Sequence, residues 1–173
     1  MTCIPISYMG AKESAIAKSS GQQQEQDMTI PDTAFFQVLG SKEKISKQKA
    51  DYQDEITGSQ KPDEYCIKCK FNLGDEKKCH IVEGEINDHG ISKFFSAKGD
   101  GMLPGDIAWD FIKKTGRKLE YDEGHVIDEG ADGFQCKDCK YFMYSGNCLL
   151  IKGNFTPEMS CGFIVKIGNG TEV

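Results

Sequence analysis

The chain has no apolar run long enough to cross a bilayer and no stripe of clustered lysine and arginine. A membrane-spanning helix needs about 20 consecutive apolar residues. Acidic residues outnumber basic ones by 27 to 21, which gives a net charge of -6. Nucleic acids are bound chiefly through clustered Lys and Arg. We therefore expect neither a membrane nor a nucleic acid as a partner.

Catalytic motifs are also missing. The sequence has only three histidines, no glycine-rich nucleotide loop, no Ser-His-Asp order and no acid and base paired by a motif. We therefore expect a protein that is not an enzyme.

The first ten residues lack the apolar core of a secretion signal and lack a twin-arginine motif. This predicts synthesis in the cytoplasm without a signal peptide. A reducing cytosol disfavours structural disulfides and leaves the eight cysteines free to bind metal.

The composition predicts a small, loop-rich fold. A hydrophobic content of 38% is thin for one large core in 173 residues, and nineteen glycines indicate many loops. The chain could form one ordinary domain or two very small ones.

Four cysteines in the C-terminal part have the spacing of a metal site. Cys136, Cys139, Cys148 and Cys161 are separated by two, eight and twelve residues. Two cysteines with two residues between them can turn their sulfurs to one side of a tight turn. Short glycine-containing loops can bring the other two back to complete a cage of four thiolates.

Aromatic residues around these cysteines favour an iron-sulfur cluster over zinc. Zinc sites tend to carry polar or basic residues between their ligands, whereas a bulky inorganic cluster needs a dry pocket. The aromatic residues expected to line it are Tyr141, Phe142, Phe155 and Phe163. A tetrahedral zinc site and a pair of disulfides remain alternatives.

The motif resembles that of the high-potential iron-sulfur proteins (HiPIPs). Their pattern is a Cys-x-x-Cys pair followed by aromatics, a third cysteine leading into a glycine-containing turn, and a fourth before aromatic or aliphatic residues. Here these elements are Cys136 and Cys139, Tyr141 and Phe142, Cys148 with the turn to Gly153, and Cys161 before Phe163. The resemblance implies a small fold around one cluster of four irons and four sulfides, a 4Fe-4S cluster, and a role in one-electron transfer.

An earlier stretch repeats this pattern with one cysteine missing. Cys66 and Cys69 precede Cys136 and Cys139 by 70 residues, and Cys79 precedes Cys148 by 69. At that offset Cys161 corresponds to Ser92. Similarity at a fixed period indicates repeated units. We predict two tandem HiPIP-like units with short helices and small antiparallel strands, a degenerate one over 30–99 and a cluster-binding one over 104–173.

Each predicted unit opens with a short amphipathic helix. Residues 31–40 have Asp32 in the first turn, Gly40 as a stop, and apolar pairs four residues apart. Residues 104–116 repeat the pattern, with Asp106 as a candidate N-cap and Gly116 as a stop. The four pairs expected to face the core are Ala34 with Val38, Phe35 with Leu39, Ile107 with Phe111, and Ala108 with Ile112.

The degenerate unit could hold a second metal site or none. Cys66, Cys69 and Cys79 would supply three ligands, and the fourth could come from His89, His80, Ser92 or Cys3. Alternatively, its thiols are small buried apolar groups, or form disulfides.

Residues 1–29 are polar and contain almost nothing to bury. We expect an extended N-terminal arm that a partner protein or a neighbouring subunit holds in place. Two functions follow. A cluster could stabilise a small domain of a structural component of a larger assembly, such as a virus particle, or the protein could carry single electrons.

Overall fold

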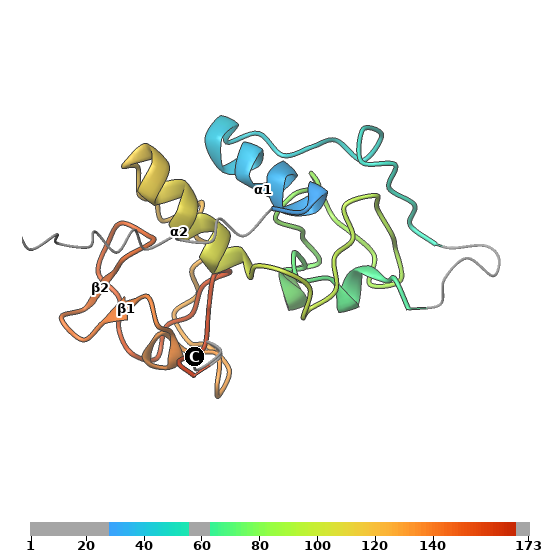
Figure 1. The fold of residues 1–173 in the computed structure, drawn as a ribbon. Helices are drawn as coiled ribbons and strands as arrows, with labels where there is room; N and C mark the ends of the chain where they lie inside the picture. Colours follow the sequence, from blue (N-terminus) through green and yellow to red (C-terminus); the bar gives the residue numbers. More distant parts are fainter. Residues whose placement is uncertain (1–27, 56–62, 169–173) are drawn as a thin grey trace, which may run out of the picture.

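The computed structural model describes residues 28–55 and 63–168. Two helices, α1 (Ile30–Ser41) and α2 (Pro104–Thr115), are the main regular elements. The strands β1 (Phe142–Met143) and β2 (Asn147–Cys148) form a two-stranded antiparallel sheet. Long loops and three short 3-10 turns make up most of the remainder (Figure 1). The predicted small, loop-rich α+β fold is therefore confirmed, although most of the expected arm, residues 1–27, lies outside the described residues.

Helix α1 begins one residue earlier than predicted because Thr29 caps it. The Thr29 hydroxyl accepts a hydrogen bond from the Asp32 backbone N–H, and the Asp32 carboxylate accepts one from the Thr29 N–H. This reciprocal pair satisfies two donors at the helix start. The predicted stop at Gly40 is wrong, since the helix continues to Ser41. Lys42 ends it by adopting the left-handed conformation and donating to the Val38 carbonyl.

Helix α2 ends at Gly116 as predicted, with a left-handed φ of 70°. Asp106 is not its N-cap, because Leu103 takes that position without a side-chain hydrogen bond. The Asp106 carboxylate instead accepts a hydrogen bond from the Tyr141 hydroxyl and pairs with Lys140. All eight residues of the predicted apolar pairs on the two helices are buried.

Residues 30–99, here called the first half, and residues 104–168, the second half, share four equivalent backbone bridges. The parallel bridge Ile45–Val82 has the counterpart Leu119–Ile151. The antiparallel bridge Gln53–Ile91 has the counterpart Ile127–Ser160, and Cys69–Ala97 has Cys139–Lys166. The last pair consists of Asn72–Cys79 and Phe142–Cys148, the latter in the β1–β2 sheet.

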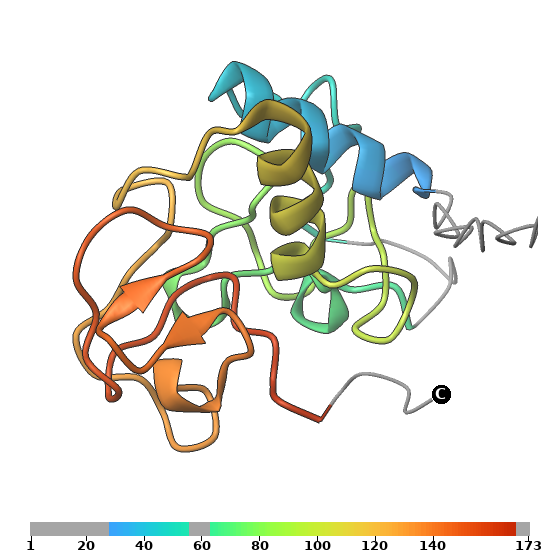
Figure 2. The ribbon, with the colours of Figure 1, turned by 60° about the vertical axis from the view of Figure 1, so that its left-hand side comes forward.

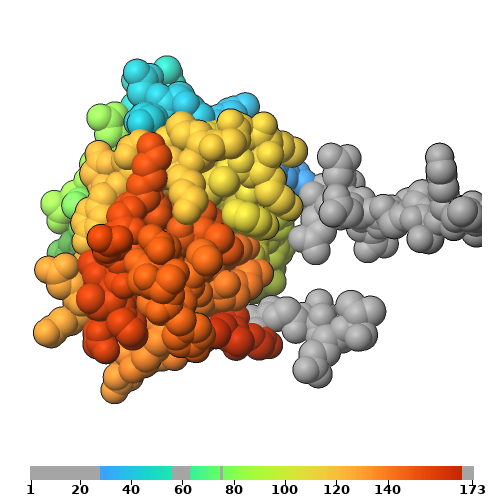
Figure 3. All heavy atoms as spheres, turned by 90° about the vertical axis from the view of Figure 1, so that its left-hand side faces the viewer, coloured from blue at the N-terminus to red at the C-terminus, as the bar shows by residue number. Residues whose placement is uncertain are grey.

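The two halves pack against each other. Helices α1 and α2 lie side by side at the top of the molecule, where the Phe36 ring meets the Phe111 ring edge-on at 5.3 Å (Figures 1 and 2). Phe35 of α1 also stacks on Phe163 at 6.1 Å. In the space-filling view of Figure 3, the second half covers one face of the molecule beneath α2.

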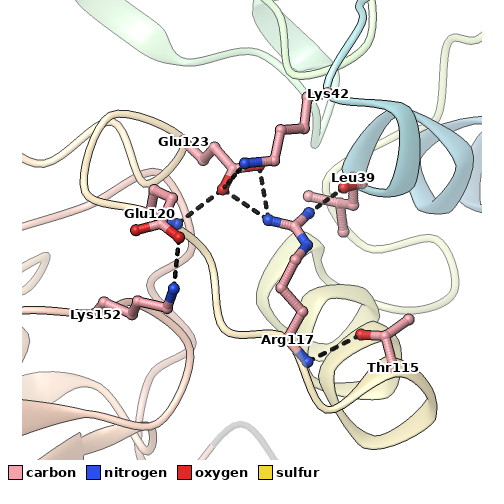
Figure 4. A network of polar contacts seen from close by, with 7 residues as sticks. All are labelled: Leu39, Lys42, Thr115, Arg117, Glu120, Glu123 and Lys152. Atoms are coloured by element: carbon pink, nitrogen blue, oxygen red, sulfur yellow. Dashed lines mark hydrogen bonds and ion pairs between the residues drawn. The ribbon is translucent and has the colours of Figure 1, made fainter.

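A polar network joins the ends of the two helices (Figure 4). The Arg117 guanidinium donates to the Leu39 carbonyl oxygen at the end of α1. It also binds both Glu123 carboxylate oxygens, at 3.1 and 2.8 Å, and Lys42 approaches the same carboxylate at 3.7 Å. The described helices include none that is long and apolar enough to traverse a bilayer.

Candidate metal centre

The four cysteines of the second half come from three separate segments. Cys136 opens the 3-10 turn η3 (Cys136–Asp138) and Cys139 follows it directly, so the turn presents both residues. Cys148 ends β2, and Cys161 lies in the loop after it. The first three are buried and Cys161 is half-buried. The fold thus collects these residues inside the second half.

The thiols are close enough to influence one another's ionisation. Burial is the main cause that raises the pKa of Cys161, and negative charge on Cys148, Cys139 or Cys136 would raise it further. Burial raises the pKa of Cys136 to about 12, again with contributions from Cys148 and Cys139. Four thiolates can share this space only beside a compensating positive charge, which a metal centre would supply.

Backbone N–H groups point at three of the four sulfurs. The Leu150 N–H lies 3.4 Å from the Cys148 Sγ, and the Val165 N–H lies 3.5 Å from the Cys139 Sγ. The Phe163 N–H also bonds to the Cys161 thiol and opposes the rise of its pKa. Such bonds favour the thiolate form, which is the form that binds metal.

The aromatic residues expected around the site pack mainly on other elements. Phe155 stacks on Tyr121 and the Tyr141 ring lies near Trp109, both at 5.9 Å. Tyr141, Phe155 and Phe163 are buried, while Phe142 is only partly so. These rings anchor the cysteine-bearing loops to α2, to the preceding loop and, through Phe163, to α1.

The first half has a pocket lined by Cys66, Cys69 and Cys79, all of them buried. Ser92 lines the same pocket. The remaining lining residues are apolar, aromatic or amide side chains: Tyr52, Asn72, Val82, Ile86, Phe94 and Phe95.

The two histidines considered as ligands lie elsewhere. His89 is exposed, is absent from the lining of this pocket, and packs its ring edge-on against Tyr65 at 5.5 Å. His80 is buried between the halves, with its Nε2 2.9 Å from the Gly162 carbonyl oxygen. Burial lowers the pKa of His80 to about 3. The structure thus brings Ser92 to the three thiols and not His89 or His80, and Cys3 lies outside the described residues.

Within residues 28–55 and 63–168, no group of three or more His, Cys, Asp or Glu side chains is arranged to hold a metal ion. The seven cysteines in these ranges are all free thiols. A zinc ion in a four-thiolate site has Zn–S bonds of about 2.3 Å, which places the sulfurs about 3.8 Å apart. In a four-iron cluster each thiolate binds a different iron, so the thiolates surround a larger body.

Two lysines near the cysteines were not singled out from the sequence. The Lys44 ammonium donates to the Cys79 carbonyl oxygen at 2.8 Å, and Lys118 donates to the Cys148 carbonyl oxygen at the same distance. Both lysines occupy equivalent places in the two halves. Lys44 and Lys118 are 74 residues apart, and the first residues of α1 and α2 are separated by the same number. This shared offset is the signal that could have identified the two lysines.

Comparison of the chain with protein-family models, with curated proteins and with solved structures finds no match.

Proposed function

We propose that the second half binds a 4Fe-4S cluster through Cys136, Cys139, Cys148 and Cys161. One observation carries this proposal: four cysteines from three segments gather inside the domain as free thiols, with backbone N–H groups directed at three of the sulfurs. Hydrogen bonds to sulfur are among the features that tune such clusters. The HiPIP-like motif agrees with the same ligand set.

The main role proposed for the cluster is to stabilise a small domain. Its ligands come from segments with little regular structure, since β1 and β2 have two residues each. Metal binding can contribute folding free energy on the order of 10 kcal/mol, whereas a core of this size supplies only about 3–5 kcal/mol. The cluster would thus stabilise loops that hydrogen bonds alone stabilise only weakly.

We further propose that the chain is a duplicated HiPIP-like unit serving as a structural component of a larger assembly, such as a virus particle. The four pairs of equivalent bridges and the equivalent lysines support duplication. The assembly role depends on the polar N-terminal segment, which would lie along a partner protein or a neighbouring subunit.

One-electron transfer is a second candidate function. It is favoured by the half-buried position of Cys161, which places one proposed ligand within reach of the surface. A carrier would show a reversible one-electron wave in voltammetry and keep its cluster. A purely structural cluster would break down on oxidation.

The first test is the iron, sulfide and zinc content of protein purified without oxygen, together with its visible spectrum. The second half should contribute about four irons and four sulfides. Zinc without iron would make the centre a zinc site, and absence of both metals would refute the proposal.

Replacing Cys136 and Cys139 together by alanine should remove the second-half cluster and lower the melting temperature by more than 10 °C, because a loss of about 1 kcal/mol shifts the midpoint by about 2–4 °C in a chain of this size. Ser145→Ala, on the exposed turn between β1 and β2, is the control and should change neither quantity. Unchanged iron content and melting temperature in the double variant would contradict the four-cysteine cage.

A further inference from the structure

The three-thiol pocket of the first half is built like the proposed cluster site. The Ile81 N–H lies 3.4 Å from the Cys79 Sγ, matching the contact of the Leu150 N–H with the Cys148 Sγ. Cys69 accepts backbone hydrogen bonds from Phe71 and Ser96. Its counterpart Cys139 accepts them from Tyr141, Phe142 and Val165. The backbone that would support thiolates is thus preserved in the first half.

Ser92 stands where the second half has Cys161. The bridge Gln53–Ile91 is equivalent to Ile127–Ser160, and Ser92 and Cys161 are the next residues in the chain. The Phe94 N–H bonds to the Ser92 hydroxyl oxygen at 3.3 Å, as the Phe163 N–H bonds to the Cys161 thiol. Position and backbone environment therefore agree, and only the ligand atom differs.

A serine hydroxyl is a poor substitute for a thiolate. Iron-sulfur clusters select soft sulfur ligands, and a hydroxyl remains protonated at neutral pH. The other side chains that line the pocket include no histidine and no carboxylate. A cluster bound by Cys66, Cys69 and Cys79 would consequently have one iron without a ligand from the described residues.

We propose that the first half is a second iron-sulfur site, in which three thiolates hold a 4Fe-4S cluster and the iron facing Ser92 is open to an exogenous ligand such as water or a small thiol. This inference rests on the proposed function of the second half. It assigns a distinct property to the first half, namely one exchangeable coordination position. A fully thiolate-bound cluster lacks that property.

The test is anaerobic reconstitution of the full chain with iron and sulfide. The wild type should hold about eight irons and eight sulfides per chain, as expected for two clusters. Replacing Cys66 and Cys69 together by serine, or their counterparts Cys136 and Cys139 together, should each remove about half of the iron. If the wild type holds about four irons and only the double variant at Cys136 and Cys139 loses them, this inference is overturned while the proposed function stands. If the wild type holds none, both fail.

The open position is tested by the rate at which EDTA removes iron. In the wild type, about one iron of the four in the first-half cluster should leave in a fast phase. Ser92→Cys should abolish that phase by supplying the missing thiolate, and Ser92→Ala should keep it because the hydroxyl is not a ligand. A fast phase that is absent from the wild type, or that Ser92→Cys leaves unchanged, would overturn the open position.

Discussion

Lys70 and Asp32 form an ion pair that is almost completely shielded from solvent. Their Nζ and Oδ1 atoms lie 2.6 Å apart, and both side chains are 1% exposed. The corresponding pair in the second half, Lys140 with Asp106, has a similar distance of 2.7 Å but is 43% and 26% exposed. The two pairs have similar distances and differ in burial, and Lys70 also donates to the Asp100 carbonyl oxygen at 2.7 Å.

Lys70→Met should lower the free energy of unfolding by about 3–5 kcal/mol, because it leaves the buried Asp32 carboxylate without its partner. Lys140→Met should cost less than about 1 kcal/mol, since water screens the exposed pair. Urea denaturation of both variants measures the difference. Equal losses would show that burial does not set the strength of these pairs.

At the scale of elements, α2 is held very close to the loop that follows Cys161. A Cβ atom added at Gly105 would overlap the Phe163 carbonyl oxygen and lie 2.6 Å from the Val165 Cγ2. In α1, a Cβ atom at Gly40 would meet only the Phe111 Cε2, at an ordinary contact distance of 3.8 Å. The close packing of α2 on this loop thus requires glycine at position 105, whereas α1 has room for a methyl group at position 40.

Gly105→Ala should destabilise the protein by about 1–3 kcal/mol, because a backbone atom in its path cannot move without shifting the loop. Gly40→Ala should stabilise it by about 0.5 kcal/mol, since alanine favours a helix more than glycine does. Chemical denaturation should therefore give opposite signs. A stabilising Gly105→Ala would mean that α2 does not rest on this loop.

At the scale of the whole molecule, Phe35 connects the two halves. It is 1% exposed and its ring lies 5.3 Å from Phe71, 5.1 Å from His80 and 6.1 Å from Phe163. Phe71 and His80 belong to the first half, and Phe163 belongs to the second. We expect these contacts to make the two halves unfold together.

Phe35→Ala should cost about 3–5 kcal/mol by opening a cavity at this junction. In the wild type, helical circular dichroism and visible absorbance should be lost in one transition, and in Phe35→Ala the two should separate. Phe134→Ala is the control, because Phe134 is 56% exposed. Coincident transitions in Phe35→Ala would show that other contacts couple the halves.

Sequence alone was sufficient for features that depend on neighbours in the chain. The apolar spacing in α1 and α2 predicted which helix faces are buried, and Gly116 predicted a helix end, because these depend on helical periodicity and local backbone conformation. The assignment of Cys136, Cys139, Cys148 and Cys161 as ligands stays a prediction. The identity of the metal also stays a prediction, because iron, zinc and disulfides accept similar spacings.

Only the tertiary structure decided which distant residues meet. It placed Ser92, and not His89, beside Cys66, Cys69 and Cys79. It also assigned Asp106 to Tyr141 and Lys140 instead of to a helix cap. The physical reason is that these contacts join segments tens of residues apart, so chain packing selects them and local propensity does not.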